Sequence, residues 1–508
     1  MLESLMMFGQ ELIGIFSITN IGLLIGATFL GIVIGAMPGL SATMGVALLT
    51  GLTYTMEMDV AVLVLMGLYV GAIYAGSISA VLIGIPGTGS AAATVLDGHP
   101  MAMQGRAKLA LSAATLASFI GTILGLLCLA AVTGQLMKIA LEFTAPEYLL
   151  MAIFGVLICG SLASQGHAIK GWIGGAFGLI LACVGMESMY AYPRFCYGNV
   201  SLYSGITMVP AMIGLFGIPC VLNALAGKQQ VGASEEAARL SKKSDHEKIW
   251  PILLRNKVNI VRSGLIGTVV GAIPGVGEDV AAWLSYDFAK KFSKKPETFG
   301  KGNIEGVLAA ECANNAAIGG AMIPLLTLAV PGSAGTAVLL GAFRLHGVNP
   351  GPMLSFNNPT FIYYVVAVLV LCAVCMRVCA LPACQVAPLI LKTPVHILMP
   401  IVCVLCCIGS YALNVNIFDV KIMLFFGIIG YLFDRIHIPA APIVLGLILG
   451  PMADEYGRRM LKASGGTLMP LISRPICLVL LLFILLTILY QLGAFKKLGV
   501  MLSKSKNK

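Results

Sequence analysis

Long apolar runs of helix length recur along the chain, and short polar segments rich in Gly and Pro separate them. Examples are residues 107–134, 148–162, 171–186, 365–380 and 476–492. A helix needs roughly 20 mostly apolar residues to cross a bilayer. The pattern therefore predicts an all-α polytopic membrane protein with about 10 to 13 membrane segments, some of them re-entrant or broken.

Two Pro-Gly breaks occur twice, in the same order. GAMPG at 35–39 returns as GAIPG at 271–275, 236 residues later, and IPGTGS at 85–90 matches VPGSAGT at 330–336, 245 residues later. This predicts two halves built on one plan. In a membrane protein, interrupted helices in corresponding positions of two halves point to a transporter binding site.

Flanking charge predicts that the two halves are inverted. No Lys or Arg precedes Arg106, so acidic residues flank the first hairpin, 21–54, whereas Lys and Arg flank the second hairpin, 258–289. Basic flanks place the second hairpin's ends in the cytoplasm, and the first hairpin opens to the other side. The alternative is that each hairpin is a full span followed by a short helix.

This orientation divides the chain into four predicted parts. They are a first transport repeat (1–225), a cytoplasmic linker (226–257), a second repeat core (258–357), and further transmembrane helices with a basic C-terminal tail (358–508).

Composition agrees with a lipid bilayer and excludes other classes. The chain of 508 residues is 58% hydrophobic and 11% charged, with a mean hydropathy of +0.94, whereas soluble domains carry about 25% charged residues. The net charge of +10 lies in loops and accompanies no nucleic-acid-binding motif, so no nucleic acid is expected as a partner. The first 17 residues lack the basic segment and cleavage motif of a signal peptide, so no cleavable one is expected.

Cysteine spacing gives no strong metal signal. The pairs Cys372/Cys375 and Cys403/Cys406 lie in apolar runs without histidine partners, which favours packed small side chains over zinc or redox chemistry.

The breaks carry the candidate substrate chemistry. A helix that begins after a Pro-Gly break presents unpaired N–H groups and its positive dipole end, and a carboxylate can bind there without a buried arginine. The alternative is that Gly and Pro only kink packed helices. The candidate substrate-binding residues are Ser41, Thr43, Gly87, Thr88, Ser90, Gly332, Ser333 and Thr336, with Thr88, Ser90, Ser333 and Thr336 expected to cap their helices. The candidate break or hinge residues are Pro38, Gly39, Pro86, Pro274, Gly275 and Pro331.

A polar cluster between the second pair of breaks is the candidate cation site. Glu311, Asn314 and Asn315 share a helix face at spacings i, i+3 and i+4. Ionisable groups within a membrane are functional candidates, and oxygen ligands suit a small hard cation. Sodium is therefore expected at Glu311 and Asn314. The alternative is that these side chains only hydrogen-bond neighbouring helices and hold them together.

Other acidic residues have competing interpretations. Asp279 is the competing cation ligand, although Glu278 and Asp279 could instead cap the helix that follows. Asp97 and His99 are expected in a polar turn, solvated or bracing a loop.

Four segments resemble the large membrane subunit of the tripartite tricarboxylate transporter family. They are GAMPGLSATMGVALL, IPGTGSAAATVLDGHPMAMQG, FGKGNIEGVLAAECANNAAIGGAMIPLLTLAVPG and GVNPGPML, and the strong resemblance covers about 31–352. It implies a permease in the bacterial inner membrane that works with a small membrane subunit and a periplasmic solute-binding protein. It also implies cation-coupled uptake of small carboxylates such as citrate.

Two departures from the family pattern leave the substrate open. The acidic pair Glu278 and Asp279 replaces small residues, and the first Pro-Gly loop is shortened near Gly89.

The function expected from these observations is secondary carboxylate transport, with no enzymatic activity and no cofactor other than Na⁺ or H⁺ as the coupling ion. The rival interpretations are the membrane subunit of a sodium-pumping decarboxylase and a passive organic-anion channel. No nucleophile–base pair or metal-ligand cluster at a fixed spacing favours the enzyme. A homodimer is left open.

Overall fold

The computed structural model describes residues 2–37, 40–162, 168–187, 189–226, 248–390, 395–412 and 414–491. The chain divides into two compact units: unit 1 contains 1–138 and 209–431, and unit 2 contains 139–208 and 432–508. Each unit combines an early and a late stretch of the sequence. The four parts expected from the repeat do not coincide with these units and stay a prediction about the repeat alone.

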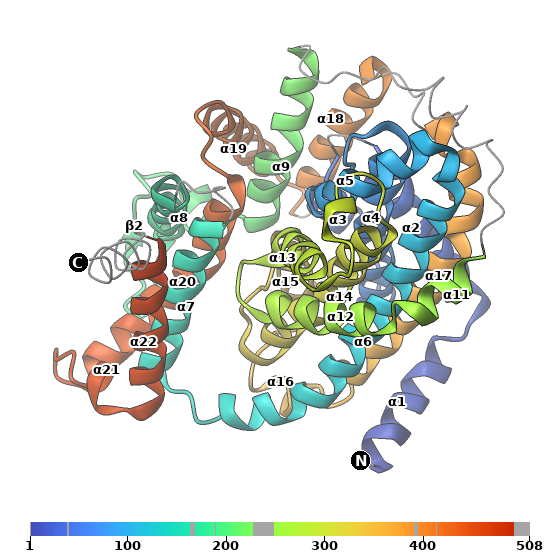
Figure 1. The fold of residues 1–508 in the computed structure, drawn as a ribbon. Helices are drawn as coiled ribbons and strands as arrows, with labels where there is room; N and C mark the ends of the chain where they lie inside the picture. Colours follow the sequence, from blue (N-terminus) through green and yellow to red (C-terminus); the bar gives the residue numbers. More distant parts are fainter. Residues whose placement is uncertain are drawn as a thin grey trace, which may run out of the picture. The chain divides into compact units, whose positions relative to one another are not determined.

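Unit 1 holds both Pro-Gly hairpins and both breaks (Figure 1). Its elements are α1 (Leu2–Ile15), α2 (Ile18–Ala36), α3 (Ala42–Leu52), α4 (Met58–Ile83), η1 (Gly89–Ala91), α5 (Ala92–Met101), η2 (Ala102–Arg106), most of α6 (Ala107–Ala140), α9 (Met208–Leu225), α11 (Ile249–Arg255), α12 (Lys257–Ala272), α13 (Gly277–Phe292), η4 (Pro296–Thr298), α14 (Ile304–Leu328), α15 (Ala334–Leu345), α16 (Leu354–Asn357), α17 (Phe361–Ile390), α18 (Val395–Ala412) and most of α19 (Ile417–Arg435).

Unit 2 is a smaller helical bundle with one short hairpin. Its elements are α7 (Ala145–Leu162), α8 (Ala168–Ala182), β1 (Gly185–Met186), β2 (Pro193–Arg194), η3 (Val200–Leu202), α20 (Ala440–Ala463), α21 (Pro470–Ser473) and α22 (Pro475–Gln491). The two strands pair antiparallel, with Gly185 opposite Arg194.

Length and composition make this an all-α, multi-pass membrane protein. Four helical stretches of the described residues are long and apolar enough to cross a membrane: Ile18–Ala36, Met58–Ile83, Gly89–Ala140 and Phe361–Val386. Seven shorter apolar helices of 10–17 residues accompany them. Two of these shorter helices, Ala42–Leu52 and Ala334–Leu345, follow Pro-Gly motifs.

The first helix of each hairpin crosses a later helix in the same way. A side chain added at Gly35 of α2 would clash with the backbone oxygen of Ala72 in α4, and one added at Gly271 of α12 would lie 2.5 Å from the backbone oxygen of Ala317 in α14. Gly31 and Gly267 make the equivalent crossings one turn earlier. These positions correspond through the same two offsets, 236 and 245, as the sequence motifs. Small residues allow backbones to approach where no hydrophobic gradient drives membrane helices together.

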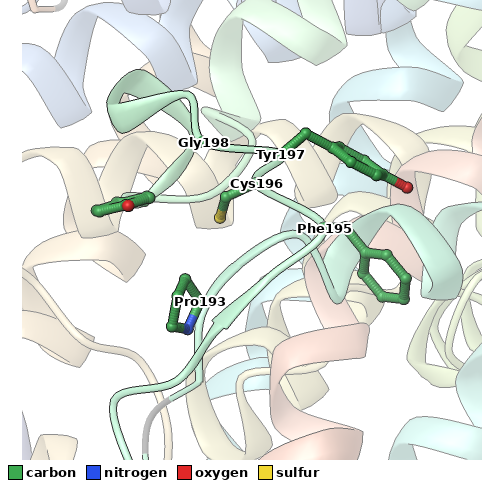
Figure 2. Close-up of a pocket in the computed structure, with 6 residues that line it drawn as sticks. Pro193, Phe195, Cys196, Tyr197 and Gly198 are labelled. Atoms are coloured by element: carbon green, nitrogen blue, oxygen red, sulfur yellow. The ribbon is translucent and has the colours of Figure 1, made fainter.

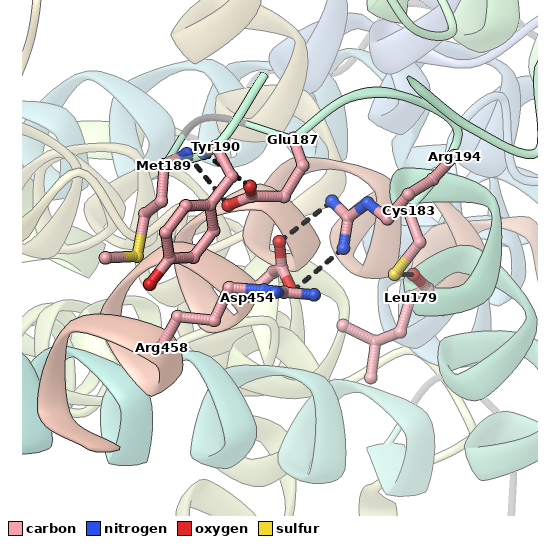
Figure 3. Close-up of polar contacts among 8 residues, drawn as sticks. All are labelled: Leu179, Cys183, Glu187, Met189, Tyr190, Arg194, Asp454 and Arg458. Atoms are coloured by element: carbon pink, nitrogen blue, oxygen red, sulfur yellow. Dashed lines mark hydrogen bonds and ion pairs between the residues drawn. The ribbon is translucent and has the colours of Figure 1, made fainter. Parts of the chain in front are cut away.

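A network of charged side chains braces the loop that follows α8 in unit 2 (Figure 3). Arg194 donates from both terminal nitrogens to Asp454, at 3.1 and 2.8 Å, and Arg458 donates to the same carboxylate at 2.8 Å. The Glu187 carboxylate accepts the N–H groups of Met189 at 2.8 Å and Tyr190 at 2.7 Å. Bidentate Arg–carboxylate pairs fix geometry as well as charge, so this pair ties Arg194 to Asp454 of α20.

Candidate functional site

The tip of the second hairpin is tied to the second break by its backbone. Gly275 N–H donates to the Pro331 carbonyl oxygen at 3.2 Å, and Gly277 N–H donates to the Gly332 oxygen at 3.0 Å. Both donors have positive φ, 74° and 70°, a conformation that glycine adopts without strain. The two Pro-Gly segments of the second half therefore form one polar junction inside unit 1.

Ser333 caps the helix that begins at the second break. Its hydroxyl accepts the Thr336 N–H at 3.2 Å, and the Thr336 hydroxyl accepts the Ser333 N–H at 2.8 Å, which completes a capping box for α15. Both residues are buried. The expected caps are present here.

Tyr69 joins this cap from α4. Its hydroxyl lies 3.2 Å from the Ser333 Oγ, although the two residues are 264 positions apart. The sequence interpretation missed Tyr69. The available signal was a tyrosine in the middle of a long apolar segment, because a tyrosine hydroxyl that becomes buried there normally has a hydrogen-bond partner.

The first break is arranged differently. Thr88 is the N-cap of η1 but makes no side-chain cap bond; its hydroxyl pairs with that of Ser90 at 3.0 Å. The expectation that Thr88 and Ser90 cap this helix is therefore wrong. The reason is local: two hydroxyls two residues apart satisfy each other, and Ser90 already lies inside the 3₁₀ turn.

Both breaks share two backbone features. A side chain at Gly87 would clash with the Gly35 oxygen, and one at Gly332 would clash with the Gly271 oxygen. Left-handed residues end the helices that precede the breaks: Gly84 with φ 68° after α4, and Ala329 with φ 57° after α14. Pro86 and Pro331 lie within these breaks, and Pro274 precedes the Gly275 turn.

The first hairpin tip is only partly described. The Ser41 hydroxyl accepts the Met44 N–H at 3.1 Å and caps α3, and Thr43 is buried in the first turn. Pro38 and Gly39 lie outside the described residues.

The acidic pair, Glu278 and Asp279, lies between the two breaks: Asp279 approaches Gly89 of the first, and Glu278 interacts with Ser333 of the second. Both residues lie in the first turn of α13, whose N-cap is Val276 and has no side-chain cap bond, so the capping interpretation is wrong. A side chain on Gly89 would lie 2.6 Å from Asp279 Oδ2, so the glycine permits this approach. Glu278 Oε2 is buried and has no hydrogen-bond partner among the described residues.

Glu311 and its neighbours form a second polar centre, here called the Glu311 cluster: Thr94, Ser118, Glu311, Asn314 and Asn315. Glu311 is fully buried, and its carboxylate accepts hydrogen bonds from the hydroxyl of Thr94 on α5 and, at 3.0 Å, from that of Ser118 on α6. The Asn315 side-chain amide donates to the Glu311 backbone oxygen at 3.1 Å. Asn314 is also fully buried, and neither side-chain polar atom has a partner in the described part of the chain.

The structure thus brings Glu311 together with two hydroxyls that the sequence interpretation did not single out. Thr94 and Ser118 lie more than 190 residues away in the chain, on helices whose polar residues give no sign of their partner. Groups of three or more His, Cys, Asp or Glu side chains placed to hold a metal are absent from the described residues.

Basic side chains are missing from the segments that build both centres. Residues 31–100, 263–289 and 302–343 contain no Lys or Arg. These segments can therefore offer an anion backbone N–H groups, hydroxyls, asparagine amides and helix dipoles, but no Lys or Arg side chain.

A cavity of about 380 Å³ lies elsewhere, in the braced loop of unit 2. Figure 2 shows its lining, which is Pro193, Phe195, Cys196, Tyr197, Gly198 and Tyr203. None of the predicted site residues belongs to it.

Comparison with known proteins decides the family. A family model described as "Tripartite tricarboxylate transporter TctA family" matches residues 21–445. The chain belongs to this TctA family. It is therefore a membrane subunit of the tripartite tricarboxylate transporter type, a transporter family, and the resemblance seen in the sequence is confirmed.

Two curated relatives are similar to the chain over different extents. The "Uncharacterized 52.8 kDa protein in TAR-I ttuC' 3'region" of Agrobacterium vitis is 35% identical over 454 residues, which is 89% of each chain. The "Uncharacterized protein in TAR-II ttuC' 3'region" of the same organism is 36% identical over 215 residues, 42% of this chain and 89% of the relative. No solved structure matches this TctA-family chain.

Proposed function

We propose that this TctA-family chain is the large permease subunit of a binding-protein-dependent secondary transporter. It imports small di- or tricarboxylates, citrate-like in chemistry, across the bacterial inner membrane, and a cation gradient drives the uptake. The observation that carries the proposal is the buried junction of the second hairpin tip and the second break around the Ser333 cap.

The substrate anion binds at the helix starts. The N-terminus of α15 offers the hydroxyls of Ser333 and Thr336 and its positive dipole end beside Gly332, in a buried segment that contains no Lys or Arg. The first break contributes Gly87, Thr88 and Ser90, and the first hairpin tip contributes Ser41 and Thr43. Two separated polar breaks suit a ligand with carboxylates at both ends.

The coupling ion binds at the Glu311 cluster. A buried carboxylate, two hydroxyl oxygens and the unpartnered oxygen of Asn314 are a donor set that fits a small hard cation such as Na⁺. The same carboxylate can instead carry a proton, and Asp279 is the competing site. Glu311→Gln keeps the shape of the side chain and removes its charge, so the proposal expects transport that no longer responds to the driving cation.

The partners follow from the family, which implies a periplasmic binding protein and a small membrane subunit. We propose that the binding protein captures the carboxylate and docks transiently on the outer face, that the small subunit stays attached, and that the two halves of unit 1 face opposite sides of the membrane. A homodimer is compatible with this scheme.

Reconstitution tests the transport proposal. The chain is placed in liposomes with an imposed sodium or proton gradient, with and without both partners, and uptake of labelled citrate is measured. The proposal expects high-affinity uptake only with the partners and only with a gradient. High-affinity uptake by the chain alone would contradict the tripartite scheme, and uptake indifferent to both gradients would favour a channel.

A matched pair of variants tests the anion site. Ser333→Ala removes a buried hydroxyl at the proposed site, and Thr50→Val removes one that bonds only within α3, to the Val46 oxygen. The substrate concentration for half-maximal uptake should rise about tenfold in the first and stay near wild type in the second. Equal effects would remove Ser333 from the binding site.

A further inference from the structure

Asp97 is a buried carboxylate of unit 1 that lies outside both proposed binding centres. Asp97 is on α5 with no exposed surface. Its Oδ1 accepts three backbone N–H groups, from Gly300 at 2.9 Å, Gly302 at 2.9 Å and Asn303 at 2.8 Å. Its Oδ2 accepts the hydroxyl of Tyr286 at 2.8 Å. Asp97 forms no ion pair with Lys or Arg in the described part of the chain, so these donors stabilise its charge.

The sequence had placed Asp97 in a polar turn with a solvated or bracing role. The structure puts it inside helix α5, and the loop that it braces comes from the other half of the chain, more than 200 residues later. That loop is shaped for the purpose. Gly300 and Gly302 have φ of 81° and 100°, which turns successive N–H groups towards one point.

The clamped loop leads directly into the helix of the Glu311 cluster. Asn303, which donates to Asp97, is also the N-cap of α14, and Glu311 follows two turns later. A side chain on Gly306, in the first turn of α14, would clash with Asp97 Oδ2, so α5 and α14 approach closely at this point.

Asp97 also shares a helix face with a Glu311 ligand. Thr94 lies three residues before Asp97, so both side chains project from the same face of α5. Thr94 donates to Glu311, and Asp97 holds the loop at the start of the Glu311 helix. The two contacts fix α5 against α14 at two levels.

We propose that Asp97 is a positioning residue for cation coupling. It clamps the first broken helix, α5, onto the start of α14, so that the Thr94 hydroxyl meets Glu311 and the first break moves together with the Glu311 helix. The proposal rests on the proposed function for its coupling readout, and it adds a residue that contacts neither the substrate nor the cation.

A double-mutant cycle tests this role. Asp97→Ala, Thr94→Val and the double variant are reconstituted with the partner subunits, and the cation concentration for half-maximal uptake is measured. Each single variant should raise that concentration about tenfold. The double variant should resemble the larger single effect, because Asp97 acts through Thr94. If the shift in the double variant equals the product of the two single-variant shifts, the two residues act independently and the proposal is overturned.

Glu147→Gln is the control for simple loss of stability. Glu147 is also a fully buried carboxylate that accepts a backbone N–H, from Thr144, but it lies in unit 2. This variant should lower the melting temperature without changing the cation dependence. A shift in cation dependence equal to that of Asp97→Ala would mean that both variants report general destabilisation.

Two further variants of Asp97 test the proposal if Asp97→Ala folds poorly. Asp97→Asn retains an oxygen for the three N–H groups and should be milder than Asp97→Ala. Asp97→Gly leaves the donors around an empty space, so added formate should restore part of the melting temperature and of the cation dependence, whereas chloride should not. No formate effect, together with equal Ala and Asn variants, would contradict the clamp.

Hydrogen exchange separates the two proposals. Without the Asp97 carboxylate, α5 and the 300–304 loop should exchange faster together. If wild-type uptake shows no cation dependence while this exchange effect is present, the coupling part of the proposed function fails and the clamp stands. Unchanged exchange in Asp97→Ala would overturn the clamp, whatever the uptake shows.

Discussion

The close crossing of α12 and α14 gives the sharpest prediction about stability. A Cβ added at Gly271 would lie 2.5 Å from the Ala317 backbone oxygen, whereas ordinary contact begins at 3.4 Å. The obstacle is backbone and cannot rotate away, so the two helices must separate by about 1 Å. Overpacking of this kind costs about 1–3 kcal/mol, because many contacts along the interface loosen together.

Gly26→Ala in α2 is the control, because nothing lies within 4 Å of a Cβ there. The assay is thermal denaturation of the detergent-solubilised protein, followed by the fraction that remains monodisperse on size exclusion. Gly271→Ala should denature several degrees below wild type, and Gly26→Ala should match wild type or exceed it, since alanine favours helix over glycine by roughly 1 kcal/mol. Equal denaturation of the two variants would refute the argument from close approach.

Three further predictions concern unit 2 and topology. Arg474→Leu should destabilise the protein by about 1–3 kcal/mol in thermal denaturation, because it leaves the buried Glu147 carboxylate without its ion-pair partner; wild-type stability would contradict this. Partial burial raises the pKa of Glu187, but the two backbone N–H donors and nearby Arg side chains outweigh it, so that pKa is lowered from 4.5. The hydrogen bonds from the Met189 and Tyr190 N–H groups to Glu187 should therefore keep the loop folded above pH 4.5, and the loop should loosen only as the pH falls through the lowered pKa. Near-ultraviolet circular dichroism of the tyrosines should show this transition in wild type and not in Glu187→Gln. Single cysteines at Glu57 and Lys294 should react with an impermeant reagent from opposite faces of the membrane, and labelling from one face would refute inverted halves.

The sequence predicted the parts of the fold that depend on local chemistry. The helix pairs expected around the two Pro-Gly motifs are present, as α2 with α3 and α12 with α13. At the second motif, Gly275 and Gly277 have positive φ, a conformation that interrupts a right-handed helix. The Ser333 cap was predictable for the same reason, since its partner is three residues away.

The contacts made across the chain were not predictable. Tyr69 meets Ser333, Thr94 meets Glu311, and Asp97 meets the 300–303 loop, each over more than 200 residues. Their neighbours in sequence are apolar and look like any packed membrane helix. Only the folded arrangement of two distant segments reveals which hydroxyl or carboxylate has a partner.

The residues that end the helices before the two breaks share a left-handed conformation, but its cost differs between the two halves. Gly84 adopts its left-handed conformation freely, in a break where Ile85 is exposed. Ala329 adopts the same conformation against the preference of an L-residue, at a cost of order 1 kcal/mol, and Val330 to Ser333 beside it are buried. Ala329→Gly would relieve strain, whereas any larger residue at Gly84 would add it. The two breaks therefore differ in conformational cost: Gly84 holds its left-handed conformation without strain, whereas the buried surroundings of Ala329 must hold that residue in place.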